Sequence, residues 1–382
     1  MTSTSSNVWR GDLIRMNKGM KWGAAVLAAG VLIGNAGVFG GSQVSAAASK
    51  PVVKPAAQPG VALKYNGKVL SLQGKLVDGV TMIPVSILRD AAGLPLSYNP
   101  GIKTYTVGSG VTKLNLEVSD YGVSAYINGS YVGDNSNSYD GKLIDGKLYV
   151  PFKLLNDYMG FQGVYTASSK TLSLSKRQMN QVTISTELIK ASDANATILI
   201  RYPQLSGLAN ADAQEAINKV FKDKAEAFAT EAKAKAKKRD AKVEHPYEFD
   251  GTFLVTYNRQ GVLSIVTDSY EYTGGAHGMT AREGFTFSLK DGKQLTLDSL
   301  LHNSADAKTK LDKLLKQKAT KDGFTDGFNG LKKDADFYVK ESGLTIFFQQ
   351  YEIGPYAAGF PTYTFNFSDL LPKGTDPFEA AK

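Results

Sequence analysis

Apolar and polar side chains alternate along several segments of the second half of the chain, which is the pattern of half-buried β-strands. In the segment nearest the carboxy terminus, 362–367, the side chains of Tyr363, Phe365 and Phe367 are expected to face the core. A tight hairpin at Asp291-Gly292 is also predicted. The predicted strands are 182–188, 196–202, 249–257, 262–272, 285–289, 294–297, 344–353 and 362–367.

Two further segments place their apolar residues at the helical spacing. One long helix is predicted over 212–239, with Asp212 and Glu215 as a capping pair. A second helix is predicted to begin after Ser304, which is expected to cap it. An antiparallel sheet packed against two main helices gives an α+β fold for residues 180–372, divided into 180–275 and 276–372.

Short apolar runs and turn signals recur at a constant spacing in residues 61–177. Each unit predicts an Asn-Gly hairpin (Asn66-Gly67 or Asn128-Gly129), an Asp-Gly turn, a short helix closed by glycine and a final strand. This region is therefore predicted to be a duplicated small β-rich module. The recurring pairs are Asp78-Gly79 and Asp145-Gly146, Pro84 and Pro151, Leu88 and Leu155, Asp90 and Asp157, Gly93 and Gly160, and Tyr98 and Tyr165.

Both units fit the pattern Asp-Gly-x-x-x-(Ile/Val)-Pro-x-x-x-Leu-x-Asp-x-x-Gly. This pattern resembles the copper amine oxidase N-terminal-like stalk domain of secreted proteins from Gram-positive bacteria. The resemblance implies a spacer or wall-contact module that holds no copper. Consistent with that, residues 61–177 contain no histidine.

The amino terminus carries the features of an export signal. Basic residues precede an apolar run over 22–40, and small residues follow it. We predict a signal peptide over 1–46 cleaved after Ala46, with cleavage after Ala48 as the alternative. An uncleaved membrane anchor is the competing interpretation. Residues 47–60, with three prolines, are expected to be an extended spacer, and 373–382 a tail.

Composition narrows the function classes. The chain has no cysteine, which excludes disulfides and thiolate chemistry. Its formal net charge of +8 is compatible with anionic polymers. The basic run 233–239 lies at a predicted helix end, where positive charge offsets the helix dipole. It contains no aromatic residue, so no nucleic-acid site is predicted.

The most conspicuous stretch for chemistry is 270–278, where paired glycines and a rare histidine follow two tyrosines. Aromatic rings with a few polar groups suit sugar rings or a protein partner. The alternative is that His277 only fixes a tight glycine turn. The candidate binding residues are Tyr272, Gly274, Gly275, His277, Tyr351 and Tyr356, with Tyr270 as a further aromatic platform.

No catalytic residues, cofactor or metal site are predicted. The three histidines, His245, His277 and His302, lack the spacing of metal ligands. The hypothesis of an enzyme acting on wall polymers rests on His277 with a nearby carboxylate as acid and base. The carboxylates considered for that role are Glu271, Glu283 and Glu352.

Three ordered motifs support a second resemblance: Tyr272-x-Gly-Gly-Ala-His-Gly, Gly292-x-x-Leu-x-Leu-x-x-Leu and Tyr351-Glu-Ile-Gly-Pro-Tyr-Ala-x-Gly. Together they resemble paired domains of uncharacterised bacterial extracytoplasmic proteins. The same pair forms the outer part of the lysozyme-responsive anti-sigma factor and the non-catalytic part of a peptidoglycan deacetylase. The resemblance implies an α+β fold that contacts lysozyme or cell-wall glycan. The cytoplasmic sigma-binding domain and the catalytic domain of those proteins are not expected here.

These observations predict a secreted, cell-wall-associated binding protein without catalytic activity. Its expected partner is peptidoglycan, another wall glycan or a lysozyme-like protein. A membrane-tethered sensor is the alternative if the signal stays uncleaved, and the membrane is expected as a partner only in that case. An enzyme acting on wall polymers is the other alternative.

Overall fold

The computed structural model describes residues 59–324 and 327–381. The predicted signal peptide and most of the predicted spacer lie outside the described residues. Residues 60–382 form one compact unit. Within the described ranges, no helix combines the length and apolar character needed to cross a membrane.

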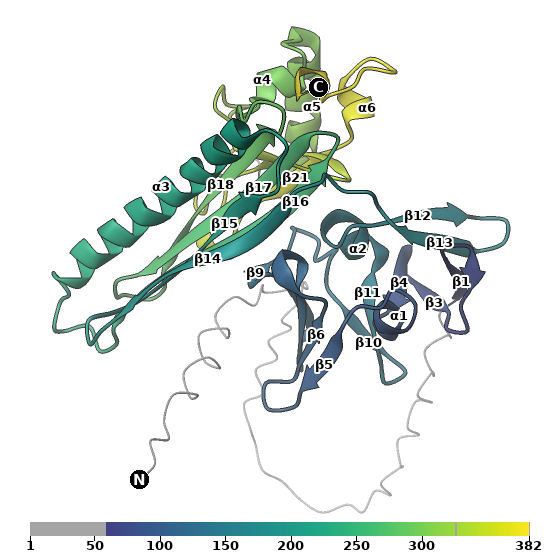
Figure 1. The fold of residues 1–382 in the computed structure, drawn as a ribbon, viewed down its shortest axis with the longest axis horizontal. Helices are drawn as coiled ribbons and strands as arrows, with labels where there is room; N and C mark the ends of the chain where they lie inside the picture. Colours follow the sequence, from purple (N-terminus) through teal and green to yellow (C-terminus); the bar gives the residue numbers. More distant parts are fainter. Residues whose placement is uncertain (1–58, 325–326, 382) are drawn as a thin grey trace, which may run out of the picture. The chain divides into compact units, whose positions relative to one another are not determined.

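The amino-terminal part of this unit, residues 60–176, consists of two sheets and two short helices (Figure 1). One sheet has the order β10-β11-β4-β3-β1-β13-β12, with β2 paired to β1, and the other has the order β5-β6-β7-β8-β9. The elements are β1 Gly60–Tyr65, β2 Lys68–Val69, β3 Gly74–Val77, β4 Val80–Pro84, α1 Ser86–Asp90, β5 Leu96–Asn99, β6 Thr104–Val107, β7 Leu114–Ser119, β8 Gly122–Ile127, β9 Ser130–Tyr131, β10 Lys142–Ile144, β11 Lys147–Pro151, α2 Phe152–Tyr158, β12 Phe161–Thr166 and β13 Thr171–Lys176.

Two parts of this region share one element order: hairpin, short helix, hairpin. Asp78 and Asp145, at the turns of the two first hairpins, both have a left-handed φ of 51°. Asn66 and Asn128 are left-handed in the same way, at φ 48° and 50°. Aspartate and asparagine tolerate this conformation better than other residues with a Cβ. The predicted Asp-Gly and Asn-Gly turns are therefore present.

One glycine in each part, Gly74 or Gly141, allows two strands to approach each other closely. Gly74 pairs with Val61, and Gly141 forms the matching bridge to Val123. A Cβ on Gly74 would lie 2.9 Å from the carbonyl oxygen of Met82, and one on Gly141 would lie 2.9 Å from the Val123 side chain. Only glycine allows the strands to approach this closely.

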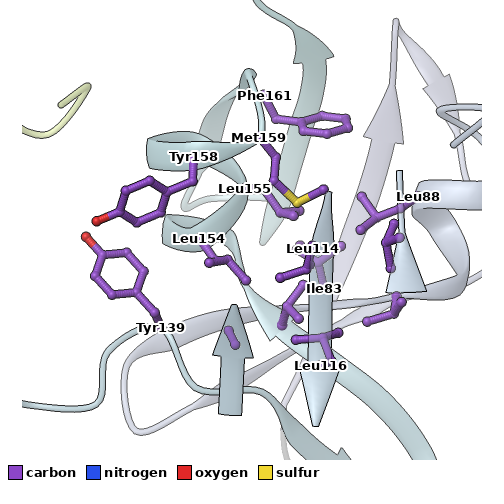
Figure 2. Packing of buried hydrophobic residues seen from close by; sticks show 14 of the residues in the cluster. Ile83, Leu88, Leu114, Leu116, Tyr139, Leu154, Leu155, Tyr158, Met159 and Phe161 are labelled. Carbon is purple, nitrogen blue, oxygen red and sulfur yellow. The ribbon is translucent and has the colours of Figure 1, made fainter. Parts of the chain in front are cut away.

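The core of this region is aliphatic, with two tyrosines at its edge. Figure 2 shows Leu154 and Leu155 of α2 directed into a cluster that includes Ile83 and Leu114. The hydroxyl groups of Tyr139 and Tyr158 point away from this cluster. Buried tyrosine hydroxyls need partners, and that of Tyr139 donates to the carboxylate of Asp157 at 2.7 Å.

The second part of the unit contains a five-stranded sheet in the order β14-β15-β16-β17-β18. Its pairs are antiparallel except β15–β16, which is parallel. The prediction of an antiparallel sheet is wrong at this pair, because α3 carries the chain back along the sheet and creates a β-α-β crossover. The elements are β14 Thr183–Ser192, β15 Ala196–Ser206, α3 Ala211–Ala236, β16 Tyr247–Arg259, β17 Val262–Tyr272 and β18 Met279–Ser288.

The long helix α3 lies along one face of this sheet, as predicted (Figure 1). Its buried residues include Ile217, Phe221 and Ala225. The N-cap is Asn210, whose side chain accepts hydrogen bonds from the backbone N–H groups of Asp212 and Ala213. The predicted capping pair of Asp212 and Glu215 is therefore wrong, because the helix begins one residue earlier.

The remaining elements form a small sheet in the order β19-β20-β21, packed against helices. Ser304 caps α5 as predicted, by accepting from the N–H of Ala307 at 3.2 Å. The predicted strand at 294–297 is reduced to one bridge between Gln294 and Phe287, because Thr296 already caps α4. The elements are α4 Leu297–Leu300, α5 Ala305–Lys321, β19 Phe337–Lys340, β20 Gly343–Phe347, β21 Thr362–Phe365 and α6 Phe367–Leu370.

The sheets are mostly antiparallel and pack against helices, so the fold is α+β, as predicted. The predicted strand at 344–353 ends early, since β20 stops at Phe347. The residues after it form a turn in which Tyr351 has a φ of 66°. This turn leads to the candidate site.

Candidate functional site

The structure brings His277, Tyr351 and Tyr356 together, although 74 positions separate His277 from Tyr351. His277 lies in the loop between β17 and β18, and the two tyrosines lie between β20 and β21. The sequence motifs that carry these residues therefore meet at one place.

Two glutamines hold the tyrosine turn against β18. The side-chain carbonyl of Gln350 accepts from the N–H of Thr280 at 2.9 Å, and that of Gln349 accepts from the N–H of Arg282 at 3.2 Å. The amide nitrogen of Gln349 also donates to the carbonyl of Arg282 at 2.8 Å. These side chains form the hydrogen bonds to backbone groups of β18 that a neighbouring strand would otherwise form. They also place Tyr351 beside His277.

The rings of the site are in direct contact. The imidazole of His277 stacks on the ring of Tyr356, with centroids 3.7 Å apart and an angle of 16° between the planes. The hydroxyl of Tyr351 lies 3.2 Å from Nε2 of His277, and Nδ1 lies 3.0 Å from the carbonyl oxygen of Gly278. Tyr351 remains 55% exposed. Both nitrogens of His277 thus have partners, and an accessible tyrosine ring lies next to them.

The loop that carries His277 depends on its glycines. Gly274 and Gly275 have φ values of 105° and 92°, which residues with a Cβ rarely adopt. Tyr272 folds over the loop and donates its hydroxyl to the carbonyl of Gly275 at 3.1 Å. A Cβ on Gly278 would lie 2.4 Å from the ring of Tyr270. The loop thus has the tight, glycine-dependent form that is expected if His277 serves to fix a glycine turn.

Tyr270 extends the group of aromatic rings. Burial raises its pKa to about 12, and Glu248, Tyr356 and Tyr272 act in the same direction. The ring of Tyr270 packs against Gly278, which follows His277 in the same loop. We call Tyr270, Tyr272, His277, Tyr351 and Tyr356 the aromatic site.

The carboxylates considered as catalytic partners of His277 are engaged elsewhere. Glu271 forms an ion pair with Lys235 at 2.5 Å, and Glu283 forms one with Lys224 at 2.6 Å. Both lysines belong to α3, on the opposite face of the sheet from Tyr270 and Tyr272. Glu352 pairs with Lys332 at 2.5 Å. The grouping of His277 with these acids is therefore not formed.

A cavity of about 400 Å³ is bordered by Gln349 and Glu352 of the tyrosine turn. Its lining includes apolar side chains and the acidic groups Asp334, Asp336 and Glu352. Burial raises the pKa of Asp336, and Glu352 adds to this effect while a hydrogen bond from Gln349 opposes it. Among the described residues, no group of three His, Cys, Asp or Glu side chains is arranged to hold a metal ion.

Sequence reasoning found the rings of the site but missed its supports. Gln349, Gln350 and Glu248 carry no motif of their own. Their positions follow from strand pairings between distant segments, and no local pattern predicts such pairings.

Comparisons with known proteins identify two domains in this part of the chain. The family described as Deacetylase PdaC matches residues 189–280, and the family described as Protein of unknown function (DUF3298) matches residues 293–368. His277 lies in the first match, and Tyr351 and Tyr356 lie in the second. The aromatic site is therefore built from both matched segments.

The Peptidoglycan-N-acetylmuramic acid deacetylase PdaC of Bacillus subtilis (strain 168) is 31% identical over 116 residues, which are 28% of this chain and 24% of the relative. The chain thus spans about a quarter of that relative's length. A DUF3298 family structure from Bacteroides fragilis has 18% identity and a TM-score of 0.40, and covers 50% of this chain and 92% of its own. A DUF3298 family structure from Pseudomonas aeruginosa has 16% identity and a TM-score of 0.34, and the match covers 50% of this chain and 93% of the chain in that structure.

Proposed function

We propose that the protein is an extracytoplasmic, cell-wall-associated protein that binds peptidoglycan glycan at the aromatic site and catalyses no reaction on it. The observation that carries the proposal is the stack of His277 on Tyr356 with the exposed Tyr351 beside it. Aromatic faces stack on the apolar C–H faces of sugar rings, and neighbouring polar groups bind hydroxyls.

Two further observations support this proposal. The Deacetylase PdaC and DUF3298 matches each supply part of the aromatic site. The relative from Bacillus subtilis is named for an activity on peptidoglycan. A domain shared with such an enzyme can serve to hold the polymer rather than to cleave it.

We infer that the chain reaches the wall by export, with cleavage after Ala46, and that residues 61–177 act as a duplicated stalk module. The basic residues and the apolar run before residue 47 support export. Mass spectrometry of the extracellular product tests this inference. A mature chain that begins near Ala47 supports secretion, whereas retention of residues 1–46 would support the tethered sensor.

Cosedimentation with purified peptidoglycan sacculi tests glycan binding. The full chain should be retained, and Tyr351→Ala and Tyr356→Ala should each weaken retention about threefold to tenfold, as expected for the loss of one aromatic contact of 0.5–1.5 kcal/mol. Tyr165→Ala is the matched control, because Tyr165 is a 45% exposed tyrosine on the distant strand β12.

Two outcomes would overturn the proposal. One is failure of the full chain to sediment with sacculi. The other is equal retention of the Tyr351 and Tyr356 variants. A parallel assay on immobilised lysozyme separates the protein partner from the glycan, and acetate release from the sacculi would show an enzyme instead.

A further inference from the structure

A carboxylate lies at one end of the aromatic site. Glu248 of β16 is paired directly with Tyr272 of β17, and the next pair on the same face is Asp250 with Tyr270. Paired residues of antiparallel strands point to one side, with Cβ atoms about 4.5–5.5 Å apart. Glu248 therefore stands beside the two tyrosines.

Glu248 differs from Asp250 beside it, because no described residue forms a hydrogen bond or ion pair with its carboxylate. Asp250, two positions along the strand, binds Arg201 through both carboxylate oxygens at 3.1 Å. The face of the sheet thus offers one half-buried carboxylate that is not neutralised by an ion pair.

The ionised form of Glu248 is electrostatically unfavourable in this position. Burial raises its pKa, Asp250 adds to the rise, and His245 opposes it. A cation bound at Glu248 would reduce this cost, because an opposite charge stabilises the ionised carboxylate.

We propose that Glu248, with the rings of Tyr270 and Tyr272, forms a subsite for the ammonium group of an amino sugar, so that the site selects wall glycan whose sugars carry free amines. This inference rests on the glycan binding proposed above. An ammonium group forms charge-assisted hydrogen bonds to a carboxylate and is attracted to tyrosine faces. An N-acetylated amine is neutral and would leave Glu248 without a partner.

The position of Glu248 favours an amine on the sugar over one on an attached peptide. The Cβ atom of Glu248 lies one cross-strand spacing, about 4.5–5.5 Å, from that of Tyr272, which is comparable to the width of a single sugar ring. A ring held against Tyr270 or Tyr272 would therefore bring its own substituents to Glu248.

Titration calorimetry with peptide-free glycan strands tests this inference, since the only amines then belong to the sugars. One preparation is de-N-acetylated, and a portion of it is re-N-acetylated with acetic anhydride. At about pH 6, where amines are protonated, the full chain should bind the de-N-acetylated strands about tenfold more tightly. Glu248→Gln should reduce this preference to less than about twofold.

Glu187→Gln is the matched control. Glu187 belongs to the same sheet and is paired with Tyr202, which packs against the α3 side of the sheet. This variant removes the same charge from the opposite face and should keep the tenfold preference. Loss of the preference there would show a general charge effect and would overturn the subsite.

The outcomes separate the two proposals. If the full chain binds both preparations equally, or if Glu248→Gln keeps the preference, the ammonium subsite is wrong while glycan binding stands. If the full chain binds neither preparation, both proposals are wrong.

Discussion

At the residue scale, the site is made by a few contacts that allow little change. Gly278 is the clearest case, because the ring of Tyr270 and the carbonyl of Glu271 occupy the space that a Cβ would need. The rarity of histidine and the paired glycines indicated this loop in the sequence. Its partners Gln349 and Gln350 carried no such signal, because their role depends on the neighbouring strand.

Gly278→Ala is expected to destabilise the protein by about 1–3 kcal/mol, because the added methyl group overlaps an aromatic ring and a backbone carbonyl. Chemical denaturation measures the change in the free energy of unfolding. Ala276→Ser, at an exposed position in the same loop, should stay within about 0.5 kcal/mol. Similar stabilities for the two variants would show that the packing of Tyr270 on Gly278 is wrong.

A second residue, Asp134, gives a pH-dependent prediction. Burial alone would raise its pKa, but Lys153 and hydrogen bonds from Ser138 outweigh burial and lower it to about 2. A depressed carboxyl pKa stabilises the folded state above the unfolded value near 3.8, and this stabilisation is lost as pH falls towards 2. Its expected size is about 2 kcal/mol.

Denaturation at several pH values between 5 and 2 tests this prediction. Asp134→Asn should be less stable than the parent chain near pH 5, and its stability should fall less steeply over this range. Asp120→Asn, on an exposed turn, should keep the parent's slope. An unchanged slope in Asp134→Asn would contradict the assignment.

At the scale of elements, hydrophobic periodicity predicted the strands and helices well, and their ends less well. The long helix and the Asn-Gly and Asp-Gly hairpins are present where local patterns placed them. The parallel pairing of β15 with β16 was not predicted, because strand direction in a sheet depends on how the crossover helix packs. The sequence pattern predicts a strand through the turn at Tyr351, because alternation continues through residues that leave the sheet.

The cap of α3 offers a test at this scale. Asn210→Ala should cost about 1 kcal/mol of folding stability, because two N–H groups at the helix start lose their acceptor. Asp212→Ala should cost less, since that carboxylate only interacts with the helix dipole. Thermal or chemical denaturation compares the two variants. A larger loss in Asp212→Ala would restore the original capping prediction.

At the scale of the whole unit, the turn between β19 and β20 links residues 60–176 to the second part of the unit. Lys340 is 2% exposed and donates to the hydroxyl of Tyr139 at 2.8 Å, while Ser342 donates to Asp157 at 3.0 Å. Between them, Glu341 pairs with Arg177 and Arg259. Such long-range contacts have no local signature, so the sequence does not predict them.

Lys340→Ala is expected to cost about 1–3 kcal/mol, because it leaves buried polar groups without a partner. Scanning calorimetry should show one unfolding transition for the parent chain and a split or broadened transition for this variant. Lys333→Ala, at an exposed lysine of the loop before β19, serves as the control. A single unshifted transition in Lys340→Ala would mean that the turn does not couple the two parts.

The central claim is that the aromatic site binds wall glycan. Titration calorimetry of soluble, peptide-free glycan strands into the full chain tests it most directly. We predict saturable binding by the parent chain and by Tyr165→Ala, and a loss of at least about tenfold in affinity in the double variant Tyr351→Ala and Tyr356→Ala. Equal affinity in the double variant, or no heat of binding with the parent chain, would contradict the claim.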